Sequence, residues 1–172
     1  MAITTNREVL LEYIRTTTLP LINGTGNYNL EASAISRNFR IPSELDNHDF
    51  PIIFILDDFP TNYAQTTANQ YTTGTDISDI TNGMTIALMG YVKTGREMGF
   101  SKTGEISKES NKLHSDMVVA MHSDRSLGGN CLSVSLLSSV NSLEFAESDV
   151  GVVIQTYGIK YDFNPTGNSP ST

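Results

Sequence analysis

Two neighbouring carboxylates, Asp57 and Asp58, directly follow a short apolar run in the sequence. Carboxylates at the end of a buried strand often bind Mg²⁺, which takes oxygen ligands. A magnesium site also needs ligands from other strand ends, and no partner for this pair is evident. The pattern therefore favours the solvent-exposed end of a strand over a metal site.

Two histidines, His114 and His122, lie in a segment with helical periodicity. Eight residues turn a helix by about 800°, so the two rings project about 80° apart and lie about 12 Å apart along the axis. They cannot share one metal ion on that helix, and the zinc-protease pattern of two histidines four residues apart with a glutamate is absent. We expect both to be surface residues.

The single cysteine, Cys131, could act as a nucleophile with one of these histidines as its base. Nothing around it resembles a protease signature, so we interpret it as a small residue of a strand. One cysteine excludes an internal disulfide and any site built from several cysteines. The sequence also has no serine nucleophile elbow and no phosphate-binding loop ending in Gly-Lys-Ser or Gly-Lys-Thr. We predict a protein that is not an enzyme and that needs no cofactor or metal.

The chain of 172 residues carries 11 basic and 19 acidic residues, which gives a formal net charge of −8. Phosphate contacts require Lys and Arg, so this balance argues against general nucleic-acid binding and against docking on anionic membranes. The length fits one domain. No apolar run approaches the roughly 18 residues of a transmembrane helix. The first residues show no basic-then-apolar leader, so we expect no secretory signal.

Charged residues make up only 17% of the chain, whereas 19 Thr, 18 Ser and 14 Asn supply most of its polarity. Soluble monomers usually cover themselves with more charge. Hydroxyls and amides are easier to desolvate against a partner, because no ion loses its water. The composition indicates a part of an assembly, although a host lineage with polar-rich proteins would explain it as well.

Hydrophobic periodicity predicts two helices and four strands. The apolar run at 50–56 predicts a strand buried on both faces. Residues 83–93 alternate between two faces, and Leu132, Val134 and Leu136 alternate with Cys131, Ser133 and Ser135. The first helix opens on the capping-box spacing of Thr5 and Glu8, and the second carries an i+4 stripe of Leu113, Met117 and Met121. The last two strands are close in sequence and are expected to be antiparallel. The predicted elements are, in order, a helix at 5–19, strands at 50–56 and 83–93, a helix at 105–123, and strands at 131–136 and 150–163. This order predicts an α+β fold with one mixed, mostly antiparallel sheet and two main helices packed on it.

Polar stretches separate these elements. Residues 30–49 are predicted to be irregular, and a loop is predicted at 94–104. The segment 57–82 is rich in Thr, Asn and Gln and is long for a loop, so it forms either a poor hairpin or a loop that orders against a partner. Residues 164–172 contain two prolines and no apolar residue, which predicts a polar C-terminal tail.

The C-terminal third carries a resemblance. Its predicted helix ends in Met121-His122-Ser123-Asp124 and runs into Arg125-Ser126-Leu127-Gly128-Gly129-Asn130; after a strand and an acidic connector comes Val152-Val153-Ile154-Gln155-Thr156-Tyr157-Gly158-Ile159-Lys160-Tyr161. This arrangement resembles the tail terminator (tail completion, head–tail joining) proteins of long-tailed bacteriophages. In that family a turn of a leucine and glycines follows the helix, and the last strand ends near an aromatic residue. The earlier elements agree in order, so the resemblance covers about residues 5–163, with 124–130 as its motif-like part.

The resemblance implies one tail-terminator-like domain at 1–163, followed by the tail at 164–172. It implies a structural virion protein, assembled in the host cytoplasm, that forms a six-fold ring on the end of the finished tail tube. The implied partners are further copies of the chain, the tube protein below and the head connector above. DNA would pass through the lumen without specific binding, and an acidic wall would repel its phosphates.

In such a ring the long polar loops are the predicted contacts, because nothing else in the chain orders them. The candidate assembly contacts are Asn62, Tyr63, Gln70, Tyr71, Arg96, Lys102, Phe163 and Asn164. Two other functions stay open. Another virion part, such as a neck, head-completion or tube protein, is one, and a tube protein would polymerise into filaments. The other is a small enzyme or ligand-binding domain, which would be a monomer or dimer with a deep pocket.

Overall fold

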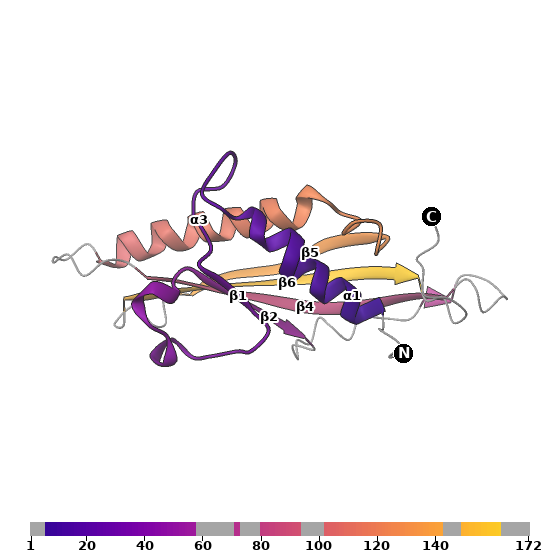
Figure 1. Cartoon of the computed structure of the whole chain (residues 1–172), viewed down its shortest axis with the longest axis horizontal. Helices are drawn as coiled ribbons and strands as arrows, with labels where there is room; N and C mark the ends of the chain where they lie inside the picture. The colour runs from indigo at the N-terminus through magenta and orange to yellow at the C-terminus, as the bar shows by residue number, and fades with distance from the viewer. Residues whose placement is uncertain (1–5, 58–70, 73–79, 94–101, 143–148, 163–172) are drawn as a thin grey trace.

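One mixed sheet forms the framework of the protein (Figure 1). The computed structural model of the chain describes residues 6–57, 71–72, 80–93, 102–142 and 149–162. The strands in chain order are β1 (Ala34–Ser36), β2 (Ile52–Asp57), β3 (Tyr71–Thr72), β4 (Ile80–Lys93), β5 (Ser133–Ser142) and β6 (Val150–Asp162). They lie in the order β1-β2-β4-β6-β5, and β3 pairs with the start of β4. β1 and β2 are parallel and the other pairings are antiparallel, so the predicted α+β class with a mixed, mostly antiparallel sheet is confirmed.

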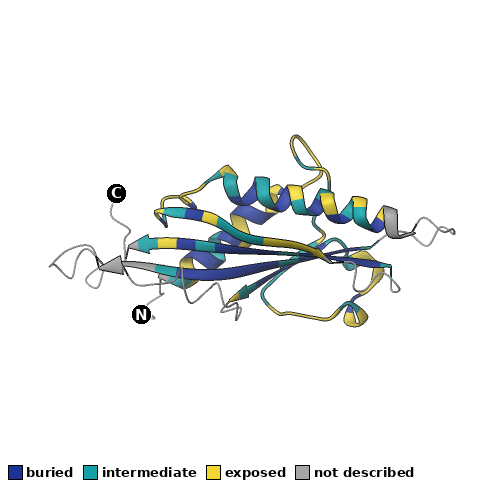
Figure 2. Cartoon of the chain, turned by 180° about the vertical axis from the view of Figure 1, so that it is seen from behind, coloured by how far each residue is buried: buried dark blue, intermediate teal, exposed yellow. Residues whose placement is uncertain are grey.

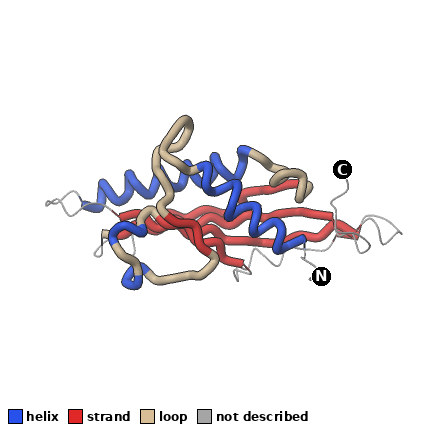
Figure 3. The backbone as a smooth tube through the Cα atoms, in the orientation of Figure 1, coloured by secondary structure: helices blue, strands red, loops and turns tan. Residues whose placement is uncertain are grey.

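Two helices of the described part of the chain cover one face of this sheet, which we call the helix face (Figure 3). They are α1 (Asn6–Tyr13) and α3 (Lys102–Ser123), and α3 contacts β4, β6 and β5. Both were predicted, and the apolar stripe of α3 is buried as expected. No helix in the described part of the chain is long and apolar enough to cross a membrane.

The regular part of α1 is shorter than the predicted helix. After Tyr13 the backbone widens into a π-type turn over Ile14–Thr18 and then tightens at Leu19–Leu21. The hydroxyl of Thr16 donates to the carbonyl of Glu12 at 2.7 Å. A side chain that bonds to the carbonyl four residues back competes with the backbone and often bends a helix, so the threonine run accounts for the early change.

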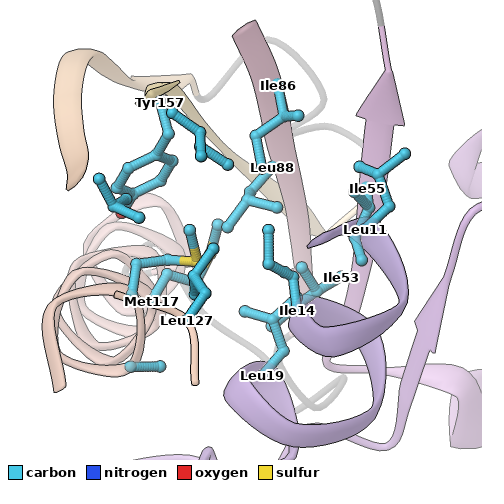
Figure 4. Close-up of a cluster of buried hydrophobic side chains, with 14 of the residues drawn as sticks. Leu11, Ile14, Leu19, Ile53, Ile55, Ile86, Leu88, Met117, Leu127 and Tyr157 are labelled. Carbon is cyan, nitrogen blue, oxygen red and sulfur yellow. The ribbon is translucent and has the colours of Figure 1, made fainter. Parts of the chain in front are cut away.

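The main core lies between the helices and the sheet (Figure 4). The labelled side chains in that view are almost fully buried: Leu11, Ile14, Leu19, Ile53, Ile55, Ile86, Leu88, Met117, Leu127 and Tyr157. In β4 the even-numbered residues Met84, Ile86, Leu88 and Val92 point into this core. The alternation predicted for that strand is therefore confirmed.

The opposite face, which we call the second face, carries a smaller core. Its buried members are Leu45, Ile52, Phe54, Tyr91, Val150 and Val152. The segment 37–50 crosses one end of this face through two short turns. Phe39 packs edge-on against Phe54 with ring centroids 5.5 Å apart, and the ammonium of Lys93 lies 5.4 Å from the centroid of the Phe50 ring. Because both faces of β2 are covered, the prediction of a doubly buried strand is confirmed.

Two predictions about the sheet need correction, and a third, which left two alternatives open, is decided in part. Residues 30–49 are not wholly irregular, because Ala34–Ser36 forms β1 beside β2. β4 begins at Ile80 rather than Gly83. Tyr71–Thr72 pairs with Ile80 and Thr81, so these residues follow the hairpin alternative for segment 57–82. The rest of that segment, 58–70 and 73–79, lies outside the described residues.

The start of the fifth strand also differs from its prediction. The alternation predicts Leu132 on the buried side and Cys131 opposite, whereas Leu132 is 56% exposed and Cys131 is buried. The reason is that β5 starts only at Ser133, so both residues still belong to the turn before it. A bulge between Leu136 and Ser138 then shifts the register against β6.

Candidate assembly surface

Most of the predicted assembly contacts lie outside the described residues: Asn62, Tyr63, Gln70, Arg96, Phe163 and Asn164. The backbone of Tyr71 forms β3 opposite Thr81 of β4, and Lys102 is the first residue of α3. The predicted contacts therefore stay predictions. The surface described below consists of other residues, on β5 and on the second face.

Asp57, the described half of the acidic pair, fastens α1 to the sheet. It ends β2 and binds the guanidinium of Arg7 in α1 through both carboxylate oxygens. Arg37, next after β1, binds Glu8 on the same helix. The two ion pairs hold the start of α1 against the ends of β1 and β2, which gives Asp57 a structural role.

A hollow of about 480 Å³ lies beside these ion pairs. It bears on the alternative that the protein is a ligand-binding domain with a deep pocket. It is lined by Arg37, Asn38, Ile55, Leu56 and Asp57 and is open to solvent. Its two charged residues are engaged with α1. A ligand site is normally a more enclosed, mostly apolar cavity with a few converging polar groups, and this hollow does not have that form.

The two histidines of α3 contact neighbouring groups rather than a common ligand. Nε2 of His114 lies 3.0 Å from Oγ of Ser139 in β5. Nδ1 of His122 donates to the Val118 carbonyl at 2.9 Å, and its ring lies 6.1 Å from that of Tyr157. Both side chains are only partly buried, which agrees with the prediction of surface histidines. α3 lies close enough to β5 and β6 for both rings to be partly covered.

Cys131 is a buried residue with a structural role. Its thiol donates to the carbonyl of Arg125 at 3.5 Å. Burial, with the negative charge of Asp124 as a second cause, raises the pKa of the Cys131 thiol to about 11. The thiolate is the reactive form of cysteine, so this side chain is a poor nucleophile at neutral pH.

The turn that carries the resemblance, residues 124–130, is organised by its first side chain. Oδ1 of Asp124 accepts hydrogen bonds from the Ser126 hydroxyl at 2.7 Å and its N–H at 3.0 Å. Oδ2 accepts from the N–H of Gly128 at 2.6 Å. These bonds, the Ser126 hydroxyl first, lower the pKa of Asp124. The carboxylate therefore supplies the acceptor for N–H groups of the turn, which follow the end of α3.

The same turn docks on α1. Leu127, Gly128 and Gly129 have φ angles of 47°, 70° and 81°, a region that glycine adopts freely and leucine does not. Leu127 is nevertheless fully buried in the main core (Figure 4), and that burial offsets its conformational cost. At Gly128 a Cβ atom would lie 2.7 Å from Cε2 of Tyr13, whose hydroxyl donates to Asp124 at 3.3 Å. The turn thus joins α1, α3 and the start of β5.

A buried carboxylate in α3, Asp116, was missed as an organising residue. It is fully buried and accepts hydrogen bonds from the N–H groups of Asn29 and Leu30 and from the Asn29 amide, at 2.7–3.0 Å. These bonds pin the exposed loop 23–30, which projects past α3 (Figure 1). The sequence held a signal for it: Asp116 lies three residues after Leu113 and one before Met117, inside the apolar stripe.

β5 forms one edge of the sheet. It pairs with β6 on one side, and no strand in the described ranges pairs with its other side. Its ten residues include no charged residue and no proline, although charges, prolines and bulges are what normally protect an edge. The bulge after Leu136 is the protection it has. β5 is also more exposed than β6 beside it (Figure 2).

A row of apolar side chains crosses the second face. The register places Phe54, Met89, Ile154 and Val140 side by side on β2, β4, β6 and β5. Exposure rises along the row, from the buried Phe54 to Val140, which is 56% exposed. At the other end Phe39 covers Phe54 and is itself 46% exposed. The row therefore has an exposed apolar side chain at each end.

The features above are an edge strand, an apolar row and a docked turn on an α+β framework. No group of three or more His, Cys, Asp or Glu side chains within the described ranges is arranged to hold a metal ion. Neither a scan against protein-family models nor a search of curated proteins finds a match to the chain. The surface features and the resemblance of the C-terminal third are therefore what indicate a function.

Proposed function

We propose that the protein is a structural assembly protein whose copies join one another, and that it forms the terminator ring of a bacteriophage tail. The observation that carries the proposal is β5, a ten-residue edge strand without a charged residue in a chain of net charge −8. Copies of like charge repel one another. An uncharged edge is where another copy can approach without desolvating an ion. The low share of charged residues supports the same conclusion.

The resemblance to tail terminators supplies the particular assembly. The resembling segment consists of the turn 124–130 with β5 and β6, and the turn sets how β5 leaves α3. The segment that carries the resemblance therefore also builds the uncharged edge. A contact between two different surfaces, repeated from copy to copy, closes into a ring when the rotation permits. Such a ring ends the tube, presents its other side to the head connector and lets DNA pass through its lumen.

Native mass measurements over a concentration series, with negative-stain images of the same samples, test this proposal. We expect closed six-fold rings, formed by the protein alone or after it is mixed with phage tail tubes that lack their own terminator. Tubes capped in this way should stop growing when tube protein is added. Filaments of the protein alone would instead make it a tube protein. Protein that stays monomeric and leaves the tubes uncapped would overturn the assembly function.

A further inference from the structure

The sheet has a second uncharged edge, and the two edges differ in length. β1, at the far side from β5, consists of Ala34, Ile35 and Ser36, and no strand in the described ranges pairs with its outer side. Two β5 strands related by a two-fold axis would make a closed pair, because each uses the same surface. β5 against β1 uses two different surfaces, so that contact can be repeated from copy to copy. A ring requires the second arrangement.

Strand direction favours the same arrangement. β1 and β2 are parallel, β4 is antiparallel to β2, β6 is antiparallel to β4, and β5 is antiparallel to β6. β5 therefore runs opposite to β1. A neighbouring copy in the same orientation presents its β1 antiparallel to β5, and antiparallel strands pair through perpendicular, closely matched hydrogen bonds. The sheet of one copy would continue into the sheet of the next without a change in pairing pattern.

The exposed ends of the apolar row indicate which surfaces meet. Val140 lies at the β5 edge of the second face, 56% exposed. Phe39 lies on the same face, near the β1 edge, 46% exposed and packed against Phe54. Pairing of β5 with β1 brings these two side chains toward each other and removes both from water. Pairing of two β5 strands would cover Val140 alone and would leave Phe39 exposed.

We infer that β5 of one copy adds to β1 of the next copy, with Val140 against Phe39 across the junction. This inference rests on the proposed function, because the choice between the two pairings depends on a ring. The partner is a second copy of this chain. The recognition consists of backbone hydrogen bonds between two uncharged edges and one apolar contact on the second face. The apolar row thereby runs on from each copy into its neighbour.

Cysteine cross-linking of the assembled protein tests the junction. Val140→Cys and Phe39→Cys are made separately in a Cys131→Ser background, which removes the native thiol. The two variants are mixed, assembled alone or on tail tubes, and treated with a short bismaleimide. We expect a cross-linked dimer from the mixture and none from either variant alone. The variant that carries both cysteines should give a ladder of multiples up to the size of the ring.

Two outcomes would overturn the inference. A dimer from Val140→Cys alone would assign the β5–β5 pairing, and rings that form and cap tubes without any product from the mixture would place the junction elsewhere. The latter result leaves the terminator function standing. Product from the mixture, with tubes that keep growing, would keep the edge pairing and remove the terminator function. The two proposals can therefore fail separately.

A charge placed on the edge gives a second test. Val140→Lys adds a protection that natural edge strands use, and we expect it to weaken self-association at least about tenfold. Leu21→Lys is the matched control, because Leu21 is 40% exposed but lies on the helical layer. Circular dichroism melts of both variants establish that they are folded. Equal association of the two variants would contradict the edge contact.

Discussion

Asp116 shows how one buried carboxylate sets the shape of a loop on the far side of α3. Replacing it by alanine leaves the N–H groups of Asn29 and Leu30 without their acceptor, and hydrogen bonds to a charged group contribute about 1.5–3 kcal/mol each. We expect Asp116→Ala to lower the free energy of unfolding by about 3 kcal/mol, the lower end of the range for two such bonds, measured by urea denaturation, and to speed exchange of the Leu30 amide. Ser115→Ala, an exposed neighbour on the same helix, is the control and should change neither.

Asp124 predicts a pH dependence at the same scale. Its pKa in the folded protein is lowered, chiefly by the Ser126 hydroxyl and the Gly128 N–H. The stability that it contributes is therefore fully present above its unfolded pKa of about 3.9 and is lost as the pH falls through the folded value. We expect Asp124→Asn to be less stable than the wild type at pH 7, with a difference that shrinks below about pH 4. Unfolding free energies measured from pH 7 to pH 3 check this, and a constant difference would contradict it.

At the scale of elements, two glycines of the sheet, Gly90 in β4 and Gly151 in β6, let α3 approach closely. A Cβ atom at Gly90 would lie 2.6 Å from Cδ2 of Leu113, and one at Gly151 would overlap the Ser110 hydroxyl. At Gly151 the Cβ atom would also lie 2.8 Å from Cγ2 of Ile106, so a shift of the Ser110 hydroxyl alone would not make room for it. We expect Gly151→Ala to cost about 1–3 kcal/mol of unfolding free energy, the usual range for an overpacked core. Thermal and urea denaturation measure it.

Gly158 provides the matched control on the same strand. Gly158 lies on the second face of the sheet. A Cβ atom there would lie 3.3 Å from Cδ1 of Leu137, the end of a flexible side chain. Gly158→Ala should therefore cost well under half as much as Gly151→Ala. Equal losses would mean that the close approach of α3 to β6 is not what Gly151 provides.

The elements that the sequence predicts well are those whose pattern is local. The apolar stripe of α3 and the alternating side chains of β4 can be recognised from neighbouring residues alone, because each element buries one face along its whole length. β1 escaped prediction, since three residues have no period and become a strand only through β2, sixteen residues further on. Leu132 was misplaced because β5 begins at Ser133, two residues after the start of the predicted strand.

The candidate site was harder to predict than the fold, for a physical reason. That β5 lies at an edge follows from the strand order β1-β2-β4-β6-β5, and strand order depends on pairings between distant segments. The lack of charged residues in β5 is visible in the sequence. That these residues form an uncharged edge of the sheet can be known only from the strand order. The predicted contacts in the polar loops, such as Asn62 and Arg96, mostly lie outside the described residues and stay predictions.

For the whole molecule, the net charge opposes self-association while the proposed junction contains no charge. This combination predicts how salt changes the strength of self-association. A net charge of −8 makes each copy repel the next, while β5 and β1 bring no ion into the proposed junction. Raising NaCl from about 0.1 M to about 1 M shortens the screening length from about 10 Å to about 3 Å. The repulsion is then screened and no attraction is lost, so we expect self-association to become severalfold tighter. Sedimentation velocity at the two salt concentrations measures this. Rings that dissociate at high salt would instead require charged contacts, and Arg96 and Lys102 would then be the first residues to substitute.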